Sequence, residues 1–360
     1  MWVYLLLLLM VLILLIISVV YVVRLTHNFL IKYVKNKITC WFLSFIPILL
    51  FILGICIDLV NAVVVDIHLI LIVSVIKFLF LLIKKMFNKH FSEYVILGIG
   101  VILTAIILIR GYYQAYTVSK TYYEIITEKD LGVDKFRIVQ ISDSHMGTTM
   151  DGNIFSKYMD DVNDLNPDIV VITGDFIDDD TSMEDIKIAS AGLGKLKTKY
   201  GVYFVYGNHD KGYYSKNKGI LLKEELEKNN VVILEDKSVD INNNIIIVGR
   251  QDREVKDRID AVNLTKNLDK SKYIIMLDHQ PNDYKNEEKA MVDLVLSGHT
   301  HGGQLIPLGQ FGLLLGSNDS IYGMKKSGHT TFIVNSGISD WAIKFKTGTK
   351  SEYVIVDIKN

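Results

Sequence analysis

Histidines and short acidic or amide side chains gather at five places in the last two thirds of the chain. Six of the nine histidines lie after residue 110, and five of these stand within two residues of an aspartate, an asparagine or another histidine. The five clusters are Asp143-Ser144-His145, Gly174-Asp175, Gly207-Asn208-His209-Asp210, Asp278-His279-Gln280 and Gly298-His299-Thr300-His301. Mixed imidazole, carboxylate and amide donors without thiolates suit Mn²⁺, Fe or Zn²⁺ better than Ca²⁺. A pair of such ions, about 4 Å apart, can activate water and stabilise both sides of an in-line displacement at phosphorus.

Each cluster directly follows a short apolar run that predicts a buried strand. The runs span 136–141, 168–173, 202–206, 273–277 and 294–296, and they are continuous rather than alternating, as in strands covered on both faces. Helices are expected at 153–163, 183–197 and 218–229, and further strands at 231–234, 244–248, 331–334 and 353–356. This order predicts an α/β fold with two packed sheets rather than one. Because sites in α/β folds form beyond the carboxyl ends of strands, the polar clusters should meet in one place.

In their order along the chain, the five clusters resemble the motifs of the calcineurin-like metallophosphoesterase family. The second motif extends to Asp178, and the fifth continues through Gly302-Gly303-Gln304, which resembles the bacterial membrane-associated branch. That branch includes enzymes similar to UDP-2,3-diacylglucosamine hydrolase and to phospholipid phosphodiesterases. The likeness covers about 135–360, after a linker and first strand at 111–134. It implies a four-layer α/β/β/α sandwich that hydrolyses phosphoester or pyrophosphate bonds with two divalent metal ions.

The resemblance also implies a role for each residue of the site. One metal ion would be held by Asp143, His145, Asp175 and His301, and the other by Asp175, Asn208, His279 and His299. His209 would assist departure of the leaving group after attack by a metal-activated hydroxide, and Asp178 would orient the His209 imidazole. Outside the motifs, His329 is expected at the surface. Three further acids are expected to be solvated or to form turns, namely Asp179, Asp180 and Asp210.

The chain departs from the family near its C-terminus. Where such proteins often carry Pro-x-Arg beside the site, this sequence has Ala342 and Lys344. Lysine keeps the positive charge but loses the two-pronged guanidinium, so the substrate selectivity of the family is not carried over to this chain.

Two alternatives to an esterase stay open, a catalytically inactive phosphate-binding or sensor domain and a nuclease of the same family. The first predicts missing ligands, and none is missing; the second is disfavoured by the net charge of −7 over 111–360, which offers nucleic acid no basic surface.

The first third of the chain is apolar and basic. Residues 1–110 hold nine Lys/Arg against three Asp/Glu, a net charge of +6. Apolar runs at about 2–23, 40–57, 67–83 and 94–109 predict a bundle of about four transmembrane helices. Lys77 interrupts the third run and is expected to snorkel or to face a partner helix. Both cysteines, Cys40 and Cys56, lie in this region, so the remainder has neither a disulfide nor a thiolate metal site.

Loop charges predict the orientation of these helices. Basic residues occupy the loops after the first and third spans, whereas the loop between the second and third spans carries Asp58 and Asp66 and no base. Because basic loops stay in the cytoplasm, four spans would place both ends of the chain on the outer face. We therefore expect a multi-pass anchor in the cell membrane, an outward catalytic domain, and phosphodiesters of lipids or the cell envelope as substrates.

Overall fold

The computed structural model describes residues 2–211 and 216–360. The chain divides into two compact units, Met1–Arg110 and Gly111–Asn360. Helix α5 (Glu93–Tyr116) crosses this division, so its last turns belong to the second unit.

In its described residues, the first unit is built of apolar helices. They are α1 (Trp2–Leu30), α2 (Lys37–Ser44), α3 (Ile46–Ile57), α4 (Leu59–Phe87) and the first part of α5. Three described stretches are long and apolar enough to cross a membrane, Lys37–Gly54, Leu59–Phe87 and Glu93–Tyr116, and Ile16–Leu30 is a shorter apolar helix. The apolar helices predicted ahead of the α/β domain are thus confirmed.

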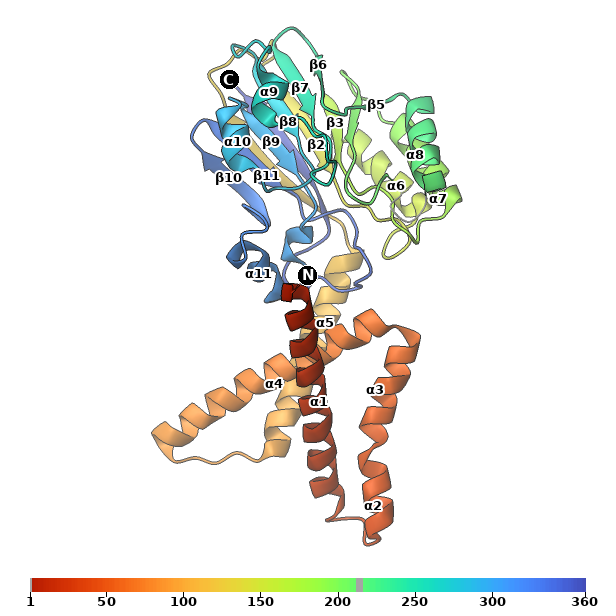
Figure 1. Ribbon diagram of the computed structural model, residues 1–360, viewed down its shortest axis with the longest axis vertical. Helices are drawn as coiled ribbons and strands as arrows, with labels where there is room; N and C mark the ends of the chain where they lie inside the picture. The colour runs from red at the N-terminus through yellow and green to blue at the C-terminus, as the bar shows by residue number, and fades with distance from the viewer. Residues whose placement is uncertain (1, 212–215) are drawn as a thin grey trace. The chain divides into compact units, whose positions relative to one another are not determined.

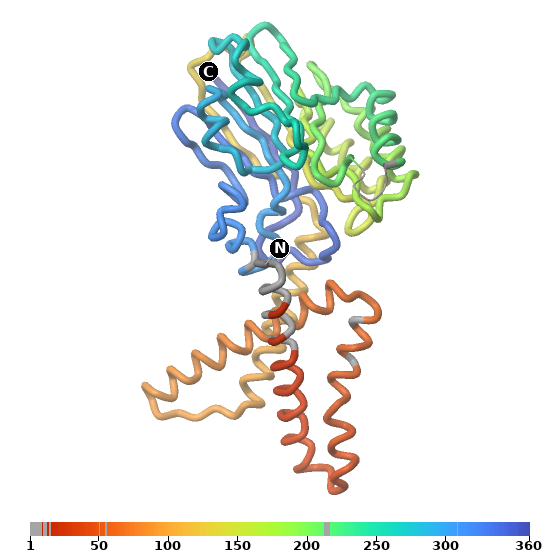
Figure 2. The backbone as a smooth tube through the Cα atoms, in the orientation of Figure 1, coloured from red at the N-terminus to blue at the C-terminus, as the bar shows by residue number. Residues whose placement is uncertain are grey.

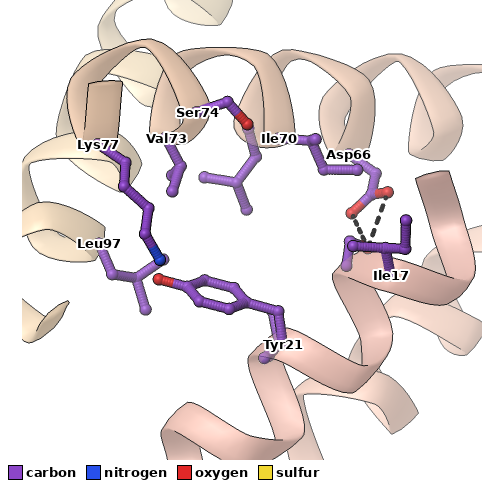
Figure 3. Close-up of a pocket in the computed structure, with 11 residues that line it drawn as sticks. Ile17, Tyr21, Asp66, Ile70, Val73, Ser74, Lys77 and Leu97 are labelled. Carbon is purple, nitrogen blue, oxygen red and sulfur yellow. Dashed lines mark hydrogen bonds between the residues drawn. The ribbon is translucent and has the colours of Figure 1, made fainter. Parts of the chain in front are cut away.

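One of the expected loops in the first unit proves to be helical. The Asp58 carboxylate caps α4 by accepting a hydrogen bond from the backbone N–H of Asn61, and the helix then continues past Asp66. The prediction of a loop at 58–66 is therefore wrong. Asp66 can lie within an apolar helix because the Ser18 hydroxyl donates to its carboxylate at 3.3 Å (Figure 3). Lys77 faces a partner helix, as one of its two expectations had it, and its Nζ lies 3.1 Å from Glu93 Oε1.

The second unit contains two six-stranded sheets. The first has the order β1 (Ser119–Ile126), β12 (Glu352–Lys359), β2 (Lys135–Ile141), β3 (Ile169–Thr173), β4 (Val202–Val205) and β5 (Val231–Ile233). The second has the order β10 (Gly323–Ser327), β11 (Thr330–Val334), β9 (Leu294–Ser297), β8 (Tyr273–Leu277), β7 (Ile245–Gly249) and β6 (Lys237–Asp240). Strands β2 to β5 run parallel in the first sheet, as do β7, β8, β9 and β11 in the second.

The last strand closes the first sheet between its two earliest strands. β12 pairs in parallel with β1 and antiparallel with β2, so the blue end of the chain lies beside the yellow segment that opens this unit (Figure 2). The expected strands all form. Sequence reasoning gave no bounds for β1, and it missed β6 and β10, whose residues are mostly polar and exposed.

Helices cover the outer face of each sheet, which makes four layers (Figure 1). On the first sheet lie α6 (Gly152–Asn163), α7 (Met183–Gly194) and α8 (Lys216–Lys228). On the second lie α9 (Ala261–Thr265) and α10 (Tyr284–Lys289). Between the sheets, a third apolar core includes Phe136 and Ile247, both fully buried. The predicted α/β/β/α sandwich is confirmed.

Candidate metal centre

The five clusters predicted from the sequence lie at the carboxyl ends of β2, β3, β4, β8 and β9. Backbone hydrogen bonds join the loops that follow these strands. The N–H of Asp143 donates to Gly174 O at 3.0 Å, and the N–H of Gly298 donates to His279 O at 2.9 Å. Across the sheets, the N–H of His299 donates to Asp143 Oδ1 at 2.8 Å, so the two sheets bring their polar tips to one place.

The first group of candidate ligands consists of Asp143, His145 and His301, all buried. His145 Nε2 lies 3.3 Å from His301 Nε2, and His301 Nε2 lies 3.8 Å from Asp143 Oδ1. Among the described residues, neither buried Nδ1 atom of the two histidines has a hydrogen-bond partner. Their nearest carboxylates are too distant for good hydrogen bonds, with Asp178 3.4 Å from His145 Nδ1 and Asp340 3.6 Å from His301 Nδ1.

The second group consists of Asp175, His279 and His299, with Asn208 against them. The Asn208 Oδ1 atom lies 3.2 Å from His279 Nε2 and 3.1 Å from His299 Nδ1. His279 Nδ1 faces the carbonyl oxygen of Thr173 at 2.7 Å, which holds a proton on Nδ1 and leaves Nε2 to a ligand. Burial lowers the pKa of His299 to about 4, so this ring is neutral near pH 7, the form that binds metal.

Asp175 lies between the two groups. Its Oδ2 atom is 3.1 Å from His279 Nε2 and 3.5 Å from His145 Nε2. This is the position expected of a carboxylate that serves two ions at once. In each group, oxygen and nitrogen atoms that can act as metal ligands converge within 4.8 Å of one another. The residues present therefore fit two divalent metal ions.

The backbone of this centre is strained. Five of the seven predicted ligands have positive φ angles, which non-glycine residues adopt rarely and at a cost of order 1–3 kcal/mol each. These residues are Asp143 (51°), His145 (32°), Asp175 (52°), His299 (71°) and His301 (48°). Such clustering is typical of functional sites, because tight turns aim neighbouring side chains at a single point. Gly298 serves the same purpose, since a Cβ atom there would collide with the Asp143 carboxylate.

His209 and Asp178 form a pair at the edge of the centre. His209 Nδ1 lies 3.0 Å from Asp178 Oδ1. Burial opposes positive charge on His209, but the hydrogen bond to Asp178 and the charge of Asp175 raise the pKa of the imidazole to about 9. Burial likewise opposes charge on Asp178, but His145 and His209 hold the pKa of its carboxyl below the usual range. The pair therefore favours an imidazolium that can donate a proton.

Asp210 was expected to be solvated or to form a turn; it lies in a turn, but it is not solvated. The side chain is fully buried rather than solvated. Its carboxylate accepts hydrogen bonds from the backbone N–H groups of Phe176, Ile177 and Gly207, at 2.7, 3.0 and 2.8 Å. Asp210 thus ties the loop after β3 to the loop after β4, which carry Asp175 and Asn208. Asp179, Asp180 and His329 are exposed, as expected.

Sequence reasoning missed three residues beside the centre, all in the segment that departs from the family pattern. Asp340 lies 3.6 Å from His301 and forms an ion pair with the fully buried Lys346 at 3.2 Å. The Trp341 ring, 46% exposed, lies 6.0 Å from the ring of His209. Little in the sequence pointed to these roles; Lys346, for example, follows Phe345 in a loop and looks like an ordinary surface lysine.

Comparison with known proteins identifies the family. Residues 136–303 match a family model described as calcineurin-like phosphoesterase. An uncharacterized metallophosphoesterase of Aquifex aeolicus is 32% identical over 257 residues, which cover 68% of this chain and 95% of that protein. The chain belongs to the calcineurin-like metallophosphoesterase family. The resemblance inferred from its motifs is confirmed.

Other metallophosphoesterases are also similar to this chain. An uncharacterized metallophosphoesterase of Campylobacter jejuni is 34% identical over 229 residues, covering 62% of this chain and 59% of that protein. A transmembrane protein with metallophosphoesterase domain from Danio rerio is 29% identical over 278 residues, covering 72% of this chain and 62% of that protein. The chain thus spans about six tenths of the length of these two relatives. Together with the apolar helices, the second relative supports membrane association.

Proposed function

We propose that this metallophosphoesterase is a membrane-anchored phosphodiesterase that hydrolyses phosphodiesters of lipids or the cell envelope. The observation that carries the proposal is the shared carboxylate. Asp175 Oδ2 faces His279 in one group of candidate ligands and His145 in the other. A single mononuclear or purely structural site would not need that arrangement, whereas phosphoester hydrolysis by paired ions does.

The proposed ligands follow from the two groups. One ion, of Mn, Fe or Zn, is assigned to Asp143, His145, Asp175 and His301, and the other to Asp175, Asn208, His279 and His299. When bound, the ions supply Lewis-acid charge that polarises the phosphoryl group and lowers the pKa of water. The protein's part is to hold these side chains in register through the loops after five strands.

His209 is the proposed proton donor to the leaving oxygen. Its Nδ1 is engaged by Asp178 at 3.0 Å, so the opposite ring nitrogen, Nε2, is left to carry the transferable proton. Asp178 keeps the ring oriented and charged. Neither residue is among the ligands proposed here, although both lie with His145 in a further group whose atoms are close enough to hold an ion, so substitutions at His209 and Asp178 test whether catalysis separates from metal binding.

Activity is the first test of this proposal. The purified full-length protein, supplied with Mn²⁺, is expected to hydrolyse both bis(p-nitrophenyl) phosphate and an alkyl phosphodiester, and His209→Ala to lose most of the activity on the alkyl ester, whose leaving group needs a proton. His329→Ala, in an exposed histidine outside the centre, is the matched control. If neither diester nor monoester substrates are hydrolysed and His209→Ala behaves as the unaltered protein does, the proposal fails. A panel of phospholipids, UDP-sugar lipids and teichoic-acid-like diesters then separates the lipid from the envelope class.

We further propose four membrane passes and a catalytic unit on the outer face. Basic residues flank the connection after α1 and the connection after α4, and a single acid, Asp58, separates α3 from α4. Basic connections favour the cytoplasm, so passes formed by α1, α2 with α3, α4 and α5 leave Gly111 outside. Protease added to intact cells should then cleave the second unit. Protection of that unit would contradict the orientation.

A further inference from the structure

A short helix beside the metal centre exposes a large apolar surface. Helix α11 (Leu308–Leu314) follows the loop of candidate metal ligands, and the four most exposed apolar side chains of its region are between 49% and 78% exposed. We name these the α11 patch: Ile306 (57% exposed), Phe311 (49%), Leu314 (78%) and Leu315 (62%). Phe311, Leu314 and Leu315 follow the i, i+3, i+4 spacing that places side chains on one face. Soluble surfaces rarely gather such residues unless something covers them.

The α11 patch lies in direct backbone contact with the loop that carries His301. A Cβ atom on Gly309, in α11, would collide with Gly303, which ends the short helix η1 (His301–Gly303). The two backbones therefore touch where only glycine fits. A cavity of about 300 Å³ lies at this junction, and its lining includes His299, Gln304 and the α11 residues Gly309 and Gly312. The cavity thus runs from a candidate metal ligand to the base of the patch.

The chain enters the second unit close to the same place. Helix α5 brings Tyr112, Tyr113 and Tyr116 into this unit, and they are 48%, 66% and 38% exposed. Exposed tyrosines at the end of an apolar helix are typical of the boundary between a membrane and water. The Tyr112 ring also lies 6.3 Å from that of Phe345, which adds a further aromatic ring at this boundary.

One segment connects these tyrosines with the α11 patch. The N–H of Lys346 donates to Gly111 O at 2.9 Å, and the next residue, Thr347, accepts from the N–H of Ile306 at 3.1 Å. Within the second unit, α11 and the end of α5 lie at one end, and α9 lies at the other (Figure 1). The α11 patch therefore lies at the end of the second unit where the chain enters it at Gly111.

We propose that the α11 patch inserts into the lipid surface of the membrane that anchors the chain. The cavity between α11 and His299 then receives the phosphorylated head group of a lipid in that bilayer. Apolar side chains gain by leaving water for the lipid. The cavity lining is largely apolar, but His299, Gln304 and Asn318 offer polar groups in it to a head group. The second part rests on the proposed phosphodiesterase function and narrows its substrates to bilayer lipids. The first part, insertion, does not depend on catalysis.

Depth-dependent fluorescence tests insertion without any enzyme assay. The full-length chain, with Cys40→Ala and Cys56→Ala, receives one new cysteine by Leu314→Cys, labelled with an environment-sensitive fluorophore. Val262→Cys, on an exposed residue of α9 (40% exposed), is the matched control. In phosphatidylcholine vesicles, the label at 314 is expected to shift to the blue and to lose fluorescence when the acyl chains are brominated, and the label at 262 to do neither. Equal responses at both positions, or none at 314, would overturn the proposal.

Two further readouts separate the remaining outcomes. In the same vesicles, Leu314→Gln with Leu315→Gln should lower the ratio of phospholipid to soluble-diester hydrolysis about tenfold, whereas Val262→Gln should leave it unchanged. An unchanged ratio would overturn the substrate assignment. Disulfide cross-linking of Leu314→Cys between copies, without quenching, would mean that a second copy covers the patch and would overturn insertion. If no phosphoester is hydrolysed at all, the proposed function fails while the quenching result stands.

Discussion

The Nε2 atoms of His145 and His301 lie 3.3 Å apart, although 156 positions separate the two residues in the chain. Two imidazole nitrogens this close cannot both present bare lone pairs, so either a proton or a cation must lie between them. A divalent cation held by both rings would satisfy both nitrogens, and the nearby Asp143 carboxylate would offset part of its charge.

Metal content should therefore respond to His301. We expect His301→Ala to reduce bound divalent metal from about two ions per chain to about one, because the second group keeps Asp175, Asn208, His279 and His299. Elemental analysis after dialysis measures the ratio. His329→Ala, at an exposed histidine, should leave it unchanged. Retention of both ions by His301→Ala would remove His301 from the ligand set.

Asp178 should matter more for catalysis than for metal binding. Asp178→Asn weakens the hydrogen bond that raises the pKa of His209 to about 9, so fewer rings stay protonated. We expect the turnover rate for an alkyl phosphodiester to fall by about 10²-fold, and much less for a p-nitrophenyl ester, whose leaving group needs no proton. Metal content should not change. Equal losses on both substrates would argue against proton donation by His209.

Gly298 should be intolerant of any side chain. A Cβ atom would overlap the Asp143 carboxylate and the side chain of Ser142, so Gly298→Ala must displace a proposed ligand. We expect metal affinity to fall about 10-fold or more, measured by competition with a chromogenic chelator. Gly98→Ala, where no atom lies within 4 Å of the new methyl group, is the control. Normal metal affinity in Gly298→Ala would show that Asp143 can move without loss.

Lys346 should support the fold beside His301. Its buried ammonium donates to the carbonyl oxygens of Ser336 and Ser339, at 2.7 and 3.1 Å, and pairs with Asp340 at 3.2 Å. Lys346→Met leaves the Asp340 carboxylate buried without its partner, and we expect a loss of about 3 kcal/mol or more in the free energy of unfolding. Thermal unfolding in detergent measures the change. The double variant Lys346→Met with Asp340→Asn should recover part of it, and no recovery would refute the pairing.

Local patterns were sufficient to predict much of this protein. Continuous apolar runs gave the parallel strands, because strands covered on both faces have no polar side to alternate with. The meeting of the polar clusters in one place could then be predicted, because parallel strands of one sheet end at the same edge. Their order then pointed to the family, and the structure brings all seven predicted ligands into two groups. The individual roles of those ligands stay predictions.

Other features depended on contacts between distant parts of the chain. Asp66 looked like a loop residue, but Ser18, 48 positions away, lets it stay inside α4. Asp210 looked like a turn residue in water, yet its carboxylate is buried between two loops. The exposure of the α11 patch could not be predicted either, because an apolar run such as Phe311-Gly-Leu-Leu-Leu315 is typical of a buried core segment.

The sequence by itself determined the family, the succession of strands along the chain and the residue types of the metal centre, because each depends on neighbours along the chain. The family resemblance had already assigned Asp175 to both ions, and the tertiary structure gives its distances to both groups of candidate ligands. Only the tertiary structure decided that Asp340 lies beside His301 and pairs with Lys346. These are pairings across loops from different strands and both sheets. Their geometry depends on how the sandwich closes, which no local pattern encodes.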